Sequence, residues 1–267
     1  MPTDSRPEKR WPTSTEELSA LQSEISRTAA ARAGEPGFMW DPRQEAAQGQ
    51  AALSRLLTAG CFVCFPHGAK GPGEKGDPGW AAAALFRGDE PVGLNVVSGA
   101  AGGPYRPGLL ALREGPLLAE AIEGLPVRPD LLLANATGLD HPRRCGLAVH
   151  LGWALDLPSV GVTHRALFAE GSMPASRVRG ATSPLRIDGE QVARWACTMD
   201  GARPLVVHPG WRTNQSVALD ALLASTPPGS RSRTPLPIRA AGQAAREARA
   251  IAEGKALGPA GPLRRGR

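Results

Sequence analysis

The sequence predicts an α/β fold in which helices pack on a mixed β-sheet. Three apolar, β-prone segments joined by short turns come first, an order typical of an antiparallel meander. After them, short and wholly apolar segments alternate with helical patterns, as expected of buried parallel strands connected by helices. The length of 267 residues allows one sizeable domain, with or without tails.

An amphipathic helix is predicted near the N-terminus. Ser14 begins the sequence Ser-Thr-Glu-Glu, a capping-box pattern in which Glu17 follows three residues later. Three apolar residues then recur at helical spacing: Leu18, Leu21 and Ile25. We therefore expect a helix that continues to about Arg32. Residues 1–13 are expected to be disordered, and a short helix is expected at 44–57.

The remaining elements follow from apolar runs and the turn residues between them. The expected meander strands are 61–65, 80–87 and 92–97. Helices are expected at 109–121, 144–155 and 216–223, and short buried strands at 131–134, 160–162 and 205–207. A meander followed by β-α-β units is the order of the ribonuclease H-like fold.

The C-terminal part of the chain differs in composition. Residues 226–267 are rich in Pro, Ser, Arg and Ala, which predicts a loose basic extension with one short helix near 240–252. The folded domain is accordingly expected at 14–225.

The net charge of +6 favours a polyanionic partner, chiefly nucleic acid. The alternative is that part of this excess belongs only to the C-terminal arginines: Arg231, Arg233, Arg239, Arg264, Arg265 and Arg267. The sequence contains no run of about 18 apolar residues and no signal-peptide pattern, so we expect a cytoplasmic protein with no membrane span, monomeric by default.

Four cysteines are present: Cys61, Cys64, Cys145 and Cys197. The first two form a C-x-x-C within an expected strand, where residues three apart point to opposite faces. That arrangement suits neither a zinc knuckle nor a redox turn, and no second pair completes a metal site. Buried free thiols are the interpretation we prefer.

A central block of motifs resembles the endonuclease V family. It contains Pro-Tyr-Arg-Pro-Gly-Leu-Leu at 104–110, Arg-Glu at 113–114, Pro-Asp at 129–130 and His-Pro-Arg-Arg at 141–144. The resemblance covers roughly residues 15–240. It implies a ribonuclease H-like fold and a metal-dependent nuclease that cuts on the 3′ side of deaminated bases such as inosine.

The resemblance also implies a binding site for a displaced base. Tyr105 and Pro107 match a wedge loop that fills the gap left by that base, and two prolines would stiffen it. Gly108 and Leu110 match positions whose main chain helps to form the base pocket. The alternative for this loop is an ordinary Pro-Gly turn with a core tyrosine.

The His-Pro-Arg block has two interpretations as well. His141 either lies beside the pocket, as in the family, or caps and pairs locally. Arg143 and Arg144 either contact phosphates or are charges on a helix surface.

The positions that match the family's catalytic residues are mostly substituted. Glu114 is retained. Phe62 and Asn135 stand where the family has carboxylates, and Trp211 stands where it has a histidine. His164 replaces a lysine. Glu114 with Asn135 would be a poor site for Mg²⁺, which prefers several hard oxygen ligands.

Three alternatives remain open around this expected site. Asp140 or Asp156 would restore a carboxylate if either lay close to Glu114. Otherwise Asp140 is a helix N-terminal residue. Trp211 either fills the space left by the lost ligands or stacks on a base.

We therefore expect an endonuclease V-like protein that recognises inosine-type bases in single-stranded or distorted DNA or RNA, with lost or much reduced metal-dependent cleavage. The first alternative is an active, Mg²⁺-dependent endonuclease V that works in DNA repair or on RNA. The second is a scaffold protein without a nucleic-acid partner, whose C-terminal segment recruits another protein.

Overall fold

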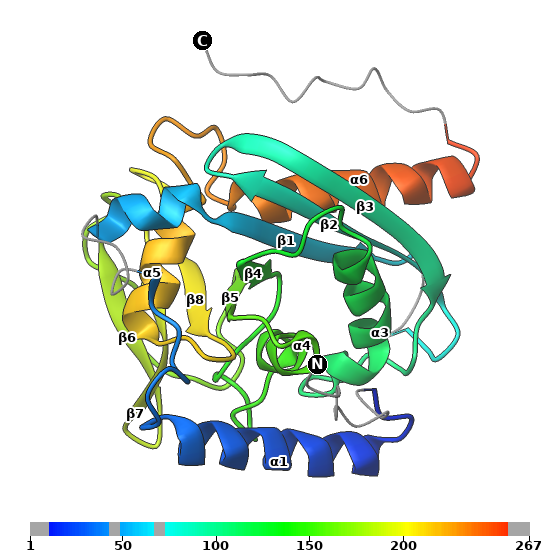
Figure 1. Cartoon of the computed structure of the whole chain (residues 1–267), viewed down its shortest axis with the longest axis horizontal. Coiled ribbons are helices and arrows are strands. Elements are labelled where there is room, and N and C mark those ends of the chain that lie inside the picture. Colours follow the sequence, from blue (N-terminus) through cyan, green and yellow to red (C-terminus); the bar gives the residue numbers. More distant parts are fainter. Residues whose placement is uncertain (1–10, 43–48, 67–72, 256–267) are drawn as a thin grey trace.

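The computed structural model describes residues 11–42, 49–66 and 73–255. Its centre is an eight-stranded sheet with the order β3-β2-β1-β4-β5-β8-β7-β6 (Figure 1). The strands are β1 (Leu57–Cys64), β2 (Pro78–Arg87), β3 (Glu90–Ala100), β4 (Leu131–Ala134), β5 (Ser159–Thr163), β6 (Thr182–Ile187), β7 (Glu190–Ala196) and β8 (Leu205–Pro209). β4 runs parallel to both β1 and β5, and the other neighbours are antiparallel. The expected mixed sheet is confirmed.

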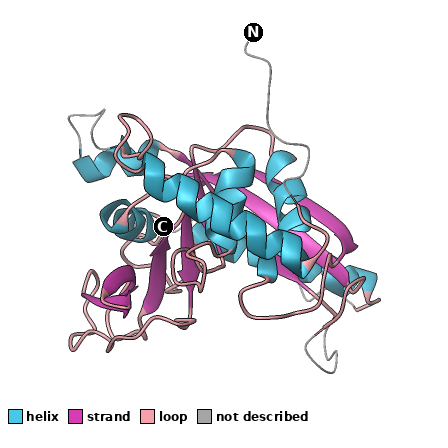
Figure 2. Ribbon diagram, turned by 90° about the horizontal axis from the view of Figure 1, so that it is seen from below, coloured by secondary structure: helices cyan, strands magenta, loops and turns pink. Residues whose placement is uncertain are grey.

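The helices cover both faces of this sheet (Figures 1 and 2). They are α1 (Thr15–Arg32), the 3₁₀ helix η1 (Gly49–Arg55), α3 (Leu110–Glu123), α4 (Leu147–Leu155), α5 (Gln215–Ala224) and α6 (Leu236–Ala252). Apolar residues of α1, α3 and α4 share one core with β1, β2 and β4. Residues of α5 and α6 pack on the opposite face. No helix in the described residues is long and apolar enough to cross a membrane.

The N-terminal helix forms as the capping pattern predicts. Ser14 Oγ accepts the N–H of Glu17 at 3.1 Å, and Leu18 and Ile25 are buried. The Glu17 carboxylate accepts the N–H of Thr13, one residue before the position that a capping box uses. Residues 1–10 lie outside the described part of the chain. At residues 11–13 the expected disorder is not found. Trp11 is ordered by stacking on His150, with ring centroids 4.9 Å apart.

Two expected helices differ in extent. The predicted helix at 144–155 begins only at Leu147, because Arg144 has a left-handed φ of 52°, which no helix continues. Of the predicted helix at 44–57, residues 44–48 lie outside the described residues. The 3₁₀ helix η1 follows, and Leu57 already belongs to β1.

The hairpin of β6 and β7 was not predicted from the sequence. Asp188 and Gly189 join its strands and both have positive φ, as a two-residue hairpin turn requires. The Asp-Gly pair was therefore a usable signal. Pro184 lies within β6, which fits its place as the edge strand of the sheet.

The C-terminal helix α6 is longer than the short helix expected and is not loose. Its buried residues include Ile238, Ala241 and Ala245, and they pack against β1 and β2. Figure 1 shows α6 lying along these strands. Residues up to Ala252 therefore contribute to the packed fold.

The four cysteines are buried and free, as expected. Cys61 belongs to the core under α3, and Cys64 belongs to the cluster under α6. The two residues of the C-x-x-C thus face opposite sides of the sheet.

The close approach of α6 to β1 predicts a sensitive glycine. A Cβ added at Gly60 would overlap the backbone of Pro237 and Ile238, whereas one added at Gly34 meets nothing within 4 Å. We expect Gly60→Ala to lower the free energy of unfolding by about 2 kcal/mol or more, because α6 must move. Urea denaturation measures this, with Gly34→Ala as the matched control. Equal stability of the two variants would contradict the packing of α6 described above.

Candidate functional site

A pocket of about 290 Å³ lies at the C-terminal ends of β4 and β5, beside the loop that precedes α3. Six residues predicted from the sequence line it: Tyr105, Pro107, Gly108, Leu110, Asn135 and His141. Gln22 of α1, Thr163 at the end of β5 and Arg165 to Leu167 contribute further walls. Five of these six, all but Asn135, are residues that the resemblance assigned to nucleic-acid binding, and the fold brings them to one place.

The loop before α3 is fastened through one carbonyl group. Gly108 O accepts from His141 Nε2 at 2.9 Å, from Arg143 Nη2 at 3.3 Å and from Gln22 Nε2 at 3.3 Å. Gln22 Oε1 in turn accepts from Arg143 Nε at 2.8 Å. Gly108 has a φ of +80°, a conformation that favours glycine. Donors from α1 and from the loop after β4 therefore set the position of the pocket wall.

His141 is neutral and buried. Burial lowers its pKa to about 4, although the bond to Gly108 opposes that shift. Its Nδ1 accepts the N–H of Arg143 at 3.2 Å, so the ring proton is on Nε2 and is donated to Gly108. His141 thus pairs locally and also lines this pocket.

A second set of bonds holds the other end of this loop. The Arg113 side chain is 3% exposed and donates to the carbonyls of Gly103 and Glu74 and to the Asp77 carboxylate, at 2.8 to 2.9 Å. Tyr105 N–H donates to Gly73 O at 3.1 Å. The ring of Tyr105 is nevertheless 46% exposed, so it is not a core tyrosine.

Glu114 lies on α3 near the end of β1. Its pKa is raised to about 7 because burial disfavours the charged carboxylate, and the neighbouring Arg113 opposes this shift. The pKa of the Cys61 thiol is raised to about 12, by burial first and then by the charge of Glu114, while the N–H of Asn135 opposes it. Cys61, Glu114 and Asn135 therefore lie together.

Phe62 and Trp211 pack elsewhere, away from the cluster of Cys61, Glu114 and Asn135. Phe62 lies on the α6 face of the sheet, with the Arg246 guanidinium 5.2 Å from its ring centre. The β1 residue that faces Glu114 is its neighbour Cys61, because successive strand residues alternate in face. Trp211 is buried edge-on to Phe38 at 5.4 Å. Trp211 therefore has no exposed face on which a base could stack.

Neither of the two alternative carboxylates, Asp140 and Asp156, takes the place of the missing metal ligand beside Glu114. Asp140 is fully buried, and its two oxygens accept the N–H groups of Leu167, Phe168 and Ala169 at 2.7 to 2.8 Å. Asp156 follows α4 and lies 3.6 Å from Arg212. Asp140 therefore orders a loop.

The two remaining basic positions, His164 and Arg144, contact other side chains of this chain at the surface. His164 Nδ1 lies 3.0 Å from Arg233 Nη2, and the pKa of His164 is lowered by burial and then by Arg233 and Arg203. Arg144 donates to the Glu190 carboxylate at 3.2 Å.

The residues around Glu114 do not fit a Mg²⁺ ion. Within residues 11–42, 49–66 and 73–255, no group of three or more His, Cys, Asp or Glu side chains could hold a metal. One carboxylate, one amide and one thiol of high pKa offer little negative charge to a hard cation. No metal-dependent step follows from these side chains.

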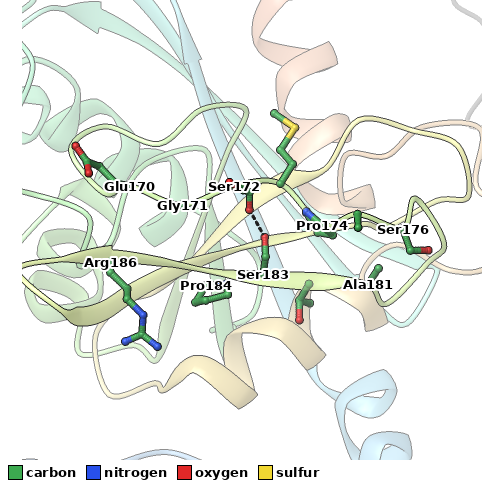
Figure 3. Close-up of a pocket in the computed structure, with 12 residues that line it drawn as sticks. Glu170, Gly171, Ser172, Pro174, Ser176, Ala181, Ser183, Pro184 and Arg186 are labelled. Carbon is green, nitrogen blue, oxygen red and sulfur yellow. Dashed lines mark hydrogen bonds between the residues drawn. The ribbon is translucent and has the colours of Figure 1, made fainter.

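A larger pocket, of about 550 Å³, lies elsewhere, between residues 170–176 and β6 (Figure 3). Its polar groups include Ser183, whose hydroxyl donates to Ser172 O, and Arg186. No predicted site residue lines it, so the smaller pocket is the candidate site.

The mixed sheet and the order of its elements place the chain in the ribonuclease H-like class of α/β folds, as expected from the sequence. Within that class, the sequence model of the endonuclease V family matches residues 70–243, and the chain belongs to this family. Endonuclease V of Methanopyrus kandleri is 42% identical over 169 residues, which cover 63% of this chain and 71% of that protein. Endonuclease V of Roseiflexus castenholzii is 41% identical over 146 residues, which cover 55% and 64%.

Solved structures give the same result. Endonuclease V of Streptomyces avermitilis superposes with a TM-score of 0.75 at 29% identity, covering 91% of this chain and 96% of that one. The catalytic domain of human endonuclease V superposes with a TM-score of 0.71 at 27% identity, covering 90% and 99%. The Ciona intestinalis enzyme, solved in complex with inosine-containing DNA, is 17% identical with a TM-score of 0.66, which shows a shared fold.

The raised pKa of Glu114 predicts a pH-dependent stability difference. A carboxyl whose pKa rises from 4.5 to about 7 on folding stabilises the folded state fully below pH 4.5, and this contribution is lost as pH rises through 7. Glu114→Gln removes the ionisation. Relative to wild type, the variant should gain up to about 3 kcal/mol of stability between about pH 4.5 and pH 8. Urea denaturation in a chelating buffer measures this, and identical pH profiles would contradict it.

The buried carboxylate of Asp140 predicts a second stability effect. Asp140→Asn replaces one acceptor oxygen by an N–H₂ group that faces backbone donors, so we expect a loss of about 2–4 kcal/mol. Asp156→Asn is the control, because Asp156 is 63% exposed. Thermal unfolding of both variants measures the difference. If Asp140→Asn were as stable as the control, Asp140 would not be a structural anchor.

Proposed function

We propose that this protein binds single-stranded or distorted nucleic acid and holds an inosine-type base in the pocket, with little or no metal-dependent cleavage. One observation carries the proposal. The pocket collects Tyr105, Gly108 and His141 on a rigidly fastened frame, beside a Glu114 that lacks the partners a metal needs.

The pocket offers the contacts that a displaced base needs. Tyr105 is exposed on a loop fixed at both ends, so its ring can occupy the gap left in a base stack. Leu110 is the first residue of α3, where backbone N–H groups have no partner within the helix. Such donors suit the carbonyl oxygen that deamination places on a purine in exchange for its amino group.

Phosphate binding is proposed for the basic groups around the pocket. Arg143 uses Nε and Nη2 within the protein, so a phosphate contact by Arg143 falls to Nη1. Arg165 lines the pocket and is exposed. The net charge of +6 supports a polyanionic partner, either DNA or RNA.

An active endonuclease V that hydrolyses the bond 3′ of a deaminated base is the second candidate. Family membership and the retained Glu114 favour it. It would use Mg²⁺ held by Glu114 and Asn135, together with phosphate oxygens of the substrate. The neutral Asn135 and Cys61 favour the binding function over this one.

A binding and cleavage experiment separates the two functions. The protein is mixed in excess with a single-stranded oligonucleotide bearing one inosine, and with the adenosine equivalent, in Mg²⁺ or Mn²⁺. We expect salt-sensitive binding that prefers the inosine strand. Tyr105→Ala should weaken the affinity for this strand about 5-fold to 150-fold. We expect no cleavage of either strand.

Glu114→Gln is the control for cleavage. Cutting beside inosine that Glu114→Gln abolishes would show an active nuclease and refute the loss of cleavage. Absence of salt-sensitive binding to any oligonucleotide would refute both functions.

A further inference from the structure

All twelve aromatic residues of the chain lie in the described segments, and two of them are exposed. One is Tyr105, at 46%, and the other is Phe168, at 51%. Tyr105 lines the pocket, and so does Leu167, the residue before Phe168. Phe168 itself does not line the pocket, so what the two exposed residues share is that each stands on a loop that contributes to its walls, one before α3 and the other after β5.

The loop that carries Phe168 is held rigidly. Asp140 Oδ2 accepts the N–H of Leu167 at 2.7 Å, and Oδ1 accepts those of Phe168 and Ala169 at 2.8 Å. A fully buried carboxylate is stable only when such donors surround it. The backbone at Phe168 is therefore fixed before any ligand arrives.

Burial on one side turns the Phe168 ring outward. Ala169 is 7% exposed and packs in the core with Leu185, Val192 and Trp195. Glu170 then pairs with Arg186 of β6 through two backbone bonds of 2.9 Å. Figure 3 shows this continuation, with Glu170 and Gly171 running beside β6. The chain thus enters the core immediately after Phe168 and leaves this ring in solvent.

Basic residues lie on the loop that carries Phe168 and around its start, whereas the exposed Glu170 follows Phe168 by two residues. Arg165 is exposed on the same loop, and His164 is bonded to Arg233 at 3.0 Å. Arg203 lies close enough to lower the pKa of both His164 and Arg233. Within the described part of the chain, no ion pair joins Arg165, Arg203 or Arg233 to an acidic side chain. An aromatic ring beside unneutralised basic groups suits a single-stranded nucleic acid, whose bases stack while its phosphates meet the cations.

We propose that Phe168 is a second base-stacking residue, which holds a nucleotide flanking the one in the pocket while Tyr105 occupies the gap. This inference rests on the proposed nucleic-acid binding. It gives the loop after β5 a recognition role and explains why Asp140 is buried beneath it.

Binding to oligonucleotides of two lengths tests the proposal. The long strand has nucleotides on both sides of a central inosine. Each of the two short strands has nucleotides on one side only, so that inosine is its 5′-terminal or its 3′-terminal residue. Phe168→Ala should weaken binding of the long strand about 5-fold to 150-fold and leave one of the two short strands unaffected. Phe168→Tyr should bind like wild type, and Phe168→Leu should bind like Phe168→Ala because it keeps an apolar surface without a ring.

Leu94→Ala is the matched control, because Leu94 is 55% exposed on β3, at the opposite edge of the sheet. It should not change binding. If wild type binds with a salt-sensitive affinity that Tyr105→Ala weakens, but Phe168→Ala leaves every affinity unchanged, the stacking role is wrong. A wild-type protein without salt-sensitive binding would overturn the proposed function and this inference together.

Discussion

The candidate site depends on the carbonyl group of Gly108. It receives three donors, His141 Nε2, Arg143 Nη2 and Gln22 Nε2, which come from α1 and from the loop after β4. Because a buried carbonyl with satisfied lone pairs is costly to move, this junction fixes the wall of the pocket. The bond to Gly108 needs a proton on His141 Nε2, and Nδ1 must be unprotonated to accept the N–H of Arg143, so the lowered pKa of His141 favours the form that makes both bonds.

A second anchor, formed by a carboxylate, holds the opposite wall of the pocket. Asp140 collects three N–H groups from the loop after β5, while Arg113 fastens the start of the loop before α3. Both side chains are buried and hydrogen-bonded to the loops around the pocket, so they stabilise its geometry. Hydrogen bonds consequently fix the walls of the pocket, whereas in the described residues Glu114 has no acidic or histidine partners that would form a metal-holding group with it.

Much of the fold follows from local patterns. The capping of α1 by Ser14, the buried strand β4 and the meander were all visible in apolar spacing and turn residues. The β6–β7 hairpin was missed because Pro184 interrupts its first strand, although Asp188 and Gly189 signalled the turn. The packing of α6 was missed because an alanine-rich helix carries few large apolar residues, yet its small face fits closely over Gly60.

The site was predictable where its residues form contiguous motifs, as at Tyr105 to Leu110 and at His141. Site residues that are distant in sequence from these motifs could not be recognised. Gln22 is an example, because nothing distinguishes it from the other polar residues of α1. The sequence also did not show which residue of β1 faces Glu114. Matching the family's Gly motif at Gly60 pointed to Phe62, but the alternation of β1 turns Cys61 toward Glu114.

The proposal to be tested is that this family member has a base-binding pocket without a competent metal site. Titration of Mn²⁺ into the protein, followed by electron paramagnetic resonance, tests it directly. Wild type and Glu114→Gln should both leave Mn²⁺ free at submillimolar concentrations, because one carboxylate of raised pKa and two neutral side chains hold the ion poorly. One bound Mn²⁺ per wild-type chain, lost in Glu114→Gln, would contradict the account.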